Sequence, residues 1–192
     1  MDNSNKIILD LCGGTGAWSR PYVENGYDVR NITLPENDIT KPKTIEMLIS
    51  LQNVYGILFA MVCTQFSGSG ARWWEEKDKD GRTLEDTKIL TSGLIIVAYC
   101  QPSEFWCLEN PIGRLNKWLG KPVMYFNPCD YGDPYTKKTA LWGKFNMPKK
   151  NPVEPVPMNE NPIWNMSPSE NRSELRSITP SGFAKAFYTA NK

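Results

Sequence analysis

The sequence contains no histidine, and this absence excludes several common kinds of active site. Neither a Ser-His nor a Cys-His catalytic pair can form, and zinc sites that use histidine are excluded as well. The five cysteines are odd in number and irregular in spacing, with no C-x-x-C pair, which argues against a disulfide framework and a metal site. Any enzyme chemistry must therefore use carboxylates, lysine or arginine, a thiolate or a bound cofactor.

The chain also lacks a strong charge of either sign and a long apolar run. Its formal net charge is +1, so any basic surface for nucleic acid has to be local. No apolar stretch is long enough to cross a bilayer, and the first residues show no signal-peptide pattern. A length of 192 residues, 40% of them hydrophobic, suits a single domain over residues 1–192, and we expect it in the cytoplasm, away from membranes.

The chain does contain a regular alternation of apolar runs and amphipathic segments. In the order strand, helix, strand, these predict elements at 7–11, 18–25, 26–32, 44–52, 54–61, 83–100 and 104–109. Such alternation predicts an α/β fold with a mostly parallel sheet and helices on both faces. Six prolines predict an extended proline-rich arm at about 147–169, and Thr179 and Pro180 are typical of the start of a last helix at 181–190.

Reactive side chains follow two of the predicted strands. Cys63 comes after the strand at 54–61, and Glu109 ends the strand at 104–109. Open α/β sheets bind ligands at the carboxyl ends of their strands, so Cys63 is a candidate nucleophile and Glu109 a candidate acid, whose pKa burial would raise. The alternatives are a cysteine that packs as a small apolar side chain, and a carboxylate that caps a helix or forms a salt bridge.

Two further segments have the composition of ligand-binding loops. Residues 10–16 (DLCGGTG) form a glycine-rich turn between a strand and a helix, where backbone N–H groups can approach a cofactor, although the spacing is not GxGxxG. Lys137 and Lys138 can hold a phosphate. The alternatives are a tight turn needed only for packing and a solvated charged pair on a hairpin.

Taken together and in order, these segments resemble the motifs of the cytosine-5 DNA methyltransferase family. Residues 10–16 resemble its DLFxGxGG cofactor loop, with Cys12 in place of the usual phenylalanine, and residues 63–67 (CTQFS) resemble its catalytic PCQxFS loop. Residues 109–111 (ENP) are similar to the ENV motif, and residues 131–143 are similar to YGxPQxRxR…G. Asp38 is similar to the aspartate that meets the adenine amine of S-adenosylmethionine, and residues 182–184 to the helix that completes the cofactor pocket.

The resemblance implies a Rossmann-like fold that uses S-adenosylmethionine to methylate C5 of cytosine in DNA. It implies that Cys63 is the covalent nucleophile and Glu109 the acid at N3, with Lys137 among the catalytic residues. The implied cofactor-binding residues are Asp10, Leu11, Cys12, Gly13, Gly14, Thr15, Gly16, Asp38, Ile39, Gly182 and Phe183. The implied substrate-binding residues are Phe66, Ser67, Arg72, Trp73, Trp74, Asn110 and Lys138.

The segment after the nucleophile loop is similar to short phage-encoded members of this family, which implies a phage protein in the cytoplasm of a bacterial host. Arg72, Trp73 and Trp74 would supply a cation and stacking surfaces for a base, or alternatively form a capped aromatic cluster. The family's large target-recognition domain is missing, and only the proline-rich arm lies at its position. We therefore expect a single-stranded or flipped-out cytosine as the substrate.

Several departures from the family pattern leave two other functions open. Val62 replaces the proline before the nucleophile, Tyr135 and Thr139 replace a glutamine and an arginine, and no acid follows the second strand. These changes favour a catalytically silent homologue that binds cofactor or nucleic acid, for example a phage decoy, whereas intact Cys63 and Glu109 favour an enzyme. The missing recognition domain favours a pyrimidine C5-modifying enzyme that acts on RNA or a free nucleotide.

Overall fold

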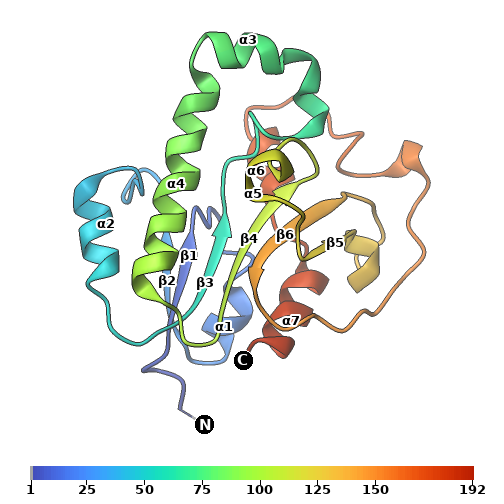
Figure 1. Cartoon of the computed structure of the whole chain (residues 1–192). Coiled ribbons are helices and arrows are strands. Elements are labelled where there is room, and N and C mark those ends of the chain that lie inside the picture. Colours follow the sequence, from blue (N-terminus) through green and yellow to red (C-terminus); the bar gives the residue numbers. More distant parts are fainter. Residues whose placement is uncertain (1) are drawn as a thin grey trace.

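The structure is a computed structural model that describes residues 2–192, and a six-stranded sheet forms its centre (Figure 1). The strands are β1 Ile7–Leu11, β2 Asp28–Ile32, β3 Val54–Ala60, β4 Phe105–Pro111, β5 Met124–Phe126 and β6 Thr139–Lys144. Their order across the sheet is β2-β1-β3-β4-β6-β5. The first four strands are parallel, whereas β6 runs antiparallel to β4 and β5 antiparallel to β6. The fold is therefore α/β with a mixed sheet.

The prediction of a mostly parallel sheet is correct for β1 to β4 and wrong for the other edge. The sequence pattern predicts neither β5 nor β6. With three residues, β5 is too short for an alternating pattern to mark it. The connection from β5 to β6 contains only a short 3-10 helix, and without a crossover helix two neighbouring strands pair antiparallel.

Helices and short 3-10 segments connect these strands. The α-helices of the described chain are α1 Arg20–Glu24, α2 Pro42–Ile49, α3 Trp74–Lys79, α4 Arg82–Cys100, α5 Asn116–Leu119, α6 Arg172–Ser177 and α7 Ser181–Ala190. The 3-10 helices are η1 Gly68–Trp73, η2 Pro128–Tyr131 and η3 Met158–Glu160. Within residues 2–192, no helix combines the length and the apolar character that crossing a bilayer requires.

The predicted helices are present, with some ends shifted. The last helix, α7, has the predicted bounds, and α4 begins one residue earlier than predicted, at Arg82. α2 begins at Pro42. Proline suits this position because N–H groups in the first turn of a helix make no hydrogen bond within the helix, so the N–H that proline lacks is not needed. Thr179 does not cap α7. Pro180 occupies the cap position, and the Asp133 carboxylate accepts a hydrogen bond from the Gly182 N–H in the first turn at 2.9 Å.

Helices cover both faces of the sheet, as predicted. On one face, Phe59 belongs to an apolar cluster with Leu48 of α2 and Ile96 of α4. On the other face, Leu58 belongs to a second cluster that contains Phe187 of α7 and residues of α1. Successive side chains of a strand point to opposite faces, so the neighbouring residues Leu58 and Phe59 of β3 belong to different clusters. Figure 1 shows helices on both faces of the sheet.

The connections after β1 and β3 leave the sheet toward opposite faces. α1 follows β1 on one face, and α4 follows β3 on the other. Because β1 and β3 are adjacent and parallel, the loops at their carboxyl ends diverge. Such a divergence leaves a crevice in which α/β proteins bind ligands.

The predicted proline-rich arm contains no strand and only one helix, η3, between residues 147 and 169. Its backbone is held against the η2 region, where the Val153 N–H donates to Cys129 O (2.9 Å) and the Val156 N–H donates to Pro134 O (2.9 Å). Helix α6, which follows the arm, is not predicted by the sequence pattern. The arm and α6 return the chain to the edge of the sheet that carries the crevice (Figure 1).

Candidate functional site

A cavity of about 1210 Å³ lies at the carboxyl ends of the parallel strands. The loops after β1, β2, β3 and β4 form much of its wall, together with the residues before β6 and parts of the segment 163–179. Pockets for one small ligand usually have volumes of about 300–1,000 Å³. This cavity is therefore larger than a usual pocket for one small ligand.

All three predicted catalytic residues, Cys63, Glu109 and Lys137, line this cavity. Cys63 lies in the loop after β3, Glu109 in β4, and Lys137 just before β6. Ala60, the last residue of β3, pairs with Glu109, so the loop with the thiol starts beside the carboxyl group. The structure thus brings together three reactive groups that are far apart in the sequence.

Burial and neighbouring charges shift the pKa of Cys63 and of Glu109. Burial raises the pKa of the Glu109 carboxyl, and the Lys137 ammonium opposes this rise. Burial also raises the pKa of the Cys63 thiol, to which Glu109 adds, whereas Lys137 and Arg176 lower it. Glu109 consequently keeps its proton to a higher pH than an exposed glutamate does, and nearby cations help Cys63 to form a thiolate.

The antiparallel direction of β6 brings Lys137 to this site. Thr139, the first residue of β6, pairs with Pro111, the last residue of β4. A parallel strand would begin at the opposite edge of the sheet and would carry Lys137 there. The side chain is further oriented by α6, because Lys137 Nζ donates to the backbone oxygen of Arg176 at 2.8 Å.

The glycine turn after β1 forms another part of the wall. The residues of this turn that line the cavity are Asp10, Cys12, Gly13, Gly14 and Thr15. Asp10 is fully buried; its Oδ2 accepts a hydrogen bond from Ser19 Oγ at 2.5 Å, and its Oδ1 has no partner among residues 2–192. Burial raises the pKa of Asp10 to about 6, so at neutral pH it carries a negative charge that no ion pair within the described chain neutralises.

The glycines of this turn leave space for a ligand. A side chain at Gly13 would collide with the carboxyl group of Asp10, whereas a Cβ added at Gly14 would meet no protein atom within 4 Å. The open space at Gly14 and the unpartnered Oδ1 of Asp10 fit a cationic ligand. S-adenosylmethionine, which carries a sulfonium and an ammonium group, has this character.

Asp38, the other charged residue of the predicted cofactor site, also lines the cavity, next to the buried Ile39. Thr40 donates to Asp38 Oδ1 from its backbone nitrogen (2.9 Å) and from its hydroxyl group (2.7 Å). These hydrogen bonds lower the pKa of Asp38. Asp38 therefore presents an ionised, oriented acceptor, which suits an amine such as that of adenine.

We expect Asp10→Asn to weaken S-adenosylmethionine binding and to stabilise the ligand-free protein. Asparagine can still accept the hydrogen bond from Ser19 but removes a buried charge. Because the pKa of Asp10 rises from 3.8 to about 6 on folding, its ionisation destabilises the fold progressively as the pH increases between these values. The variant should gain on the order of 1–2 kcal/mol in unfolding free energy at pH 7.5 and little at pH 3.

Thermal unfolding at the two pH values measures the stability effect, and calorimetry measures the affinity, which should fall by about tenfold or more. Asp28→Asn is the matched control, since Asp28 lies in β2, outside the cavity wall, and pairs with Arg30 at 2.9 Å. An Asp10→Asn variant that is more stable but binds the cofactor as tightly as the wild type would contradict a cationic ligand at Asp10.

Several residues predicted for the cofactor site lie in the core instead. Leu11 and Phe183 are fully buried, and Phe183 stacks on Phe126 with ring centres 3.9 Å apart. Gly182 allows α7 to approach η2 closely, because a Cβ there would collide with the backbone oxygen of Tyr131. Gly16, at a φ of +68°, shapes the turn and does not line the cavity.

The residues predicted to bind the substrate are also divided between the cavity wall and the buried core. Ser67 and Lys138 line the cavity, whereas Phe66 and Asn110 are fully buried away from its wall. The amide oxygen and nitrogen of Asn110 make no hydrogen bond within residues 2–192. Asn110 is therefore a buried polar group without a described partner.

The predicted stacking residues after the nucleophile loop do not reach the cavity. The Arg72 guanidinium lies 5.1 Å from the centre of the Trp73 ring, and that of Arg114 lies 5.0 Å from the centre of the Trp74 ring. None of Arg72, Trp73 and Trp74 lines the cavity wall. Their placement favours the alternative of a capped aromatic cluster at Trp74, with Trp73 exposed on η1.

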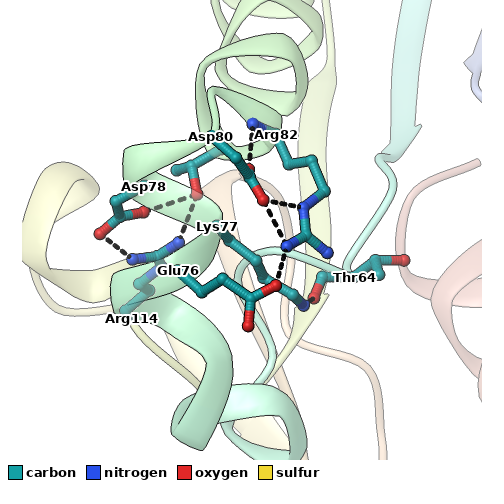
Figure 2. A network of polar contacts seen from close by, with 8 residues as sticks. Thr64, Glu76, Lys77, Asp78, Asp80, Arg82 and Arg114 are labelled. Atoms are coloured by element: carbon teal, nitrogen blue, oxygen red, sulfur yellow. Dashed lines mark hydrogen bonds and ion pairs between the residues drawn. The ribbon is translucent and has the colours of Figure 1, made fainter.

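A buried lysine that no sequence motif indicates holds the loop that carries Cys63 (Figure 2). Lys77 of α3 is only 7% exposed, and its Nζ donates to the backbone oxygen of Thr64 at 2.8 Å. Lys77 also lines the cavity. A lone lysine in a charged helix gives no sequence signal, because its burial depends on how α3 packs over the loop.

Arg114 holds the next residue of the same loop. Its Nε donates to the backbone oxygen of Gln65 at 2.9 Å, and its other two nitrogens donate to Asp78 Oδ2 (2.8 Å) and Thr83 Oγ1 (2.7 Å). Figure 2 shows the contact between Arg114 and Asp78. Lys77 and Arg114 thus hold the backbone oxygens of the two residues that follow Cys63. The loop is fixed in this way even though Val62 stands where the family motif has a proline.

We expect Lys77→Met to loosen the nucleophile loop without unfolding the protein. Methionine fills a similar volume but cannot donate to Thr64, and losing a charged hydrogen bond of this kind should speed alkylation of Cys63 by iodoacetamide about fivefold or more. Mass spectrometry of the modified peptide measures the rate. Lys79→Met is the control, because Lys79 lies on the same helix but is exposed. Equal rates in the two variants would contradict the positioning role of Lys77.

The described residues of the cavity include no grouping of side chains that suits a metal ion. Within residues 2–192, no three or more His, Cys, Asp or Glu side chains are grouped so that they could hold a metal ion. No protein-family model matches the sequence, and no curated protein matches it. We therefore infer function from the residues of the cavity.

Proposed function

We propose that this protein transfers a methyl group from S-adenosylmethionine to C5 of cytosine in DNA. The observation that carries the proposal is that Cys63, Glu109 and Lys137 share one cavity with the glycine turn and Asp38. A thiol that served only packing would need neither an acid nor a cation beside it. This combination matches the chemical requirements of the reaction.

Cytosine C5 is a poor nucleophile until a sulfur atom adds to C6. In the proposed reaction, Cys63 loses its proton to water and its sulfur forms a bond to C6, while Glu109 donates its proton to N3. S-adenosylmethionine supplies the electrophilic methyl group that C5 then takes. The cycle closes when water takes the C5 proton, the C5–C6 double bond re-forms, the sulfur–C6 bond breaks to release the Cys63 thiolate, and N3 returns its proton to Glu109.

The distribution of charge on the cavity wall also supports the proposal. Asp10 and Asp38 lie by the loops after β1 and β2, and they suit a cationic cofactor. Lys137, Lys138 and Arg176 gather by β4, β6 and α6, and they suit a phosphate backbone. Glu170 and Glu174 also line the α6 side, so this basic region is small.

Mass spectrometry of nucleosides tests the proposal directly. Purified protein is incubated with deuteriomethyl S-adenosylmethionine and matched single-stranded DNA, duplex DNA, RNA or dCMP. We expect labelled 5-methylcytosine mainly from single-stranded DNA, because flipping then costs little. Label in RNA or dCMP alone would support the alternative of another pyrimidine C5-modifying enzyme, and strong labelling of duplex DNA would contradict the preference for unpaired cytosine.

The catalytically silent alternative has one observation in its favour. The raised pKa of Cys63 leaves the thiol largely protonated in the ligand-free protein at neutral pH. A silent homologue would bind S-adenosylmethionine and DNA but would leave every substrate unlabelled. That outcome, with folded protein and measured cofactor binding, would contradict the proposed activity.

A further inference from the structure

A rigid turn of the proline-rich arm presents a tryptophan to the cavity. Asn161 is 1% exposed; its Nδ2 donates to the backbone oxygen of Thr136 at 3.0 Å, and its Oδ1 accepts from the Ile163 N–H at 2.9 Å. Ile163 is buried, whereas Trp164 is 46% exposed, and both line the cavity. The turn is thus anchored beside the residue that precedes Lys137, with an indole left partly open.

An arginine of α6 lies next to this indole. The guanidinium carbon of Arg176 is 5.7 Å from the centre of the Trp164 ring. Arg176 also lines the cavity and is close enough to Cys63 for its charge to influence the thiol. One arginine therefore connects the exposed tryptophan with the nucleophile.

We propose that Trp164 and Arg176 form a stacking site for an unpaired nucleobase that neighbours the cytosine in the cavity. This inference rests on the proposed function, because it takes a nucleic acid as the ligand. An indole face stacks on any base, and a guanidinium can stack or pair with a phosphate. A base in a duplex has both faces covered by its neighbours, so the site fits a single strand.

Binding measurements test this site independently of methyl transfer. Fluorescence anisotropy follows a labelled single-stranded oligonucleotide with one cytosine, in the presence of S-adenosylhomocysteine. Trp164→Ala should weaken binding about tenfold, and Trp164→Phe should restore much of the loss. Tyr99→Ala, which removes an exposed aromatic side chain of α4 outside the cavity wall, should bind as the wild type does.

An oligonucleotide with abasic residues on both sides of the cytosine supplies the decisive comparison. It should bind the wild type and Trp164→Ala equally, because no neighbouring base remains to stack. A Trp164→Ala variant that binds the normal oligonucleotide like the wild type would overturn the inference. So would a Trp164→Ala variant that loses affinity for S-adenosylhomocysteine and keeps its affinity for the oligonucleotide. The inference would also be wrong if Trp73→Ala weakened oligonucleotide binding and Trp164→Ala did not.

The two proposals fail in distinguishable ways. Oligonucleotide binding that depends on Trp164, with no label transferred to any substrate, would leave the stacking site standing and remove the methyltransferase activity. Label transfer that is the same in Trp164→Ala as in the wild type would support the methyltransferase activity and remove the stacking site.

Discussion

Replacing Cys63 with serine is expected to abolish methyl transfer and to leave cofactor binding intact. A serine hydroxyl group is a far weaker nucleophile than a thiol at neutral pH, so activity should fall by about a thousandfold or more. Cys63 lines the cavity but lies outside the glycine turn and Asp38, so S-adenosylhomocysteine should bind the variant as it binds the wild type. Calorimetry and label transfer to single-stranded DNA measure the two effects.

A single-stranded oligonucleotide that contains 5-fluorocytosine gives a second readout. Fluorine at C5 cannot leave as a proton does, so the wild-type protein should accumulate a covalent adduct at Cys63, and Cys63→Ser should form none. Cys129→Ser is the matched control, because Cys129 is a half-buried cysteine of η2 that does not line the cavity. Wild-type activity in Cys63→Ser would refute the proposed mechanism even though the fold is unchanged.

The second large effect is expected for Glu109→Gln. Glutamine keeps the shape of the side chain but has no proton to give to N3, so the rate should fall on the order of a hundredfold or more. Burial raises the pKa of Glu109, so its carboxyl group stays protonated to a higher pH than that of an exposed glutamate, and the wild-type rate should decline as this group ionises. The pH profile of Glu109→Gln should lack this decline.

The Lys137→Met variant tests whether the pH dependence of the rate comes from the ionisation of Glu109 or whether substitutions in the cavity only lower the activity at every pH. The Lys137 ammonium lowers the pKa of both Glu109 and Cys63, so its removal should raise both values. The rise of activity with thiolate formation and the fall with Glu109 ionisation should then both shift to higher pH. A descending limb that stays in place in this variant and in Glu109→Gln would show that Glu109 is not the acid.

Local patterns in the sequence predict four of the six strands and the position of two reactive groups. β1, β3 and β4 are mostly apolar runs, helices separate the four strands, and this pattern is visible within short windows of the chain. Because the carboxyl ends of parallel strands meet at one edge, these patterns are enough to predict that Cys63 and Glu109 lie close together. The prediction of the last helix rested instead on Thr179 and Pro180 as signals of a helix start, and its bounds are correct although Thr179 does not cap it.

Burial could not be read from the same patterns. Lys77 and Arg114 look like ordinary surface cations in the sequence, but they are buried because α3 and the segment after β4 pack around the nucleophile loop. Trp73 and Trp74 look like stacking residues for a base, whereas η1 directs them away from the cavity wall. Trp164, which does line the cavity, comes from an arm without a regular pattern.

The position of Lys137 is the clearest example of a feature that the local sequence does not predict. Its sequence neighbourhood indicates a loop with two lysines and says nothing of the strand that follows. Strand direction depends on pairing between residues distant in the chain, here Thr139 with Pro111. Because β6 pairs antiparallel with β4, its first residues lie at the edge where β3 and β4 end. The apolar pattern therefore specified the strand that precedes the Cys63 thiol and the strand that contains the Glu109 carboxyl group. Long-range strand pairing alone placed the Lys137 ammonium group beside them.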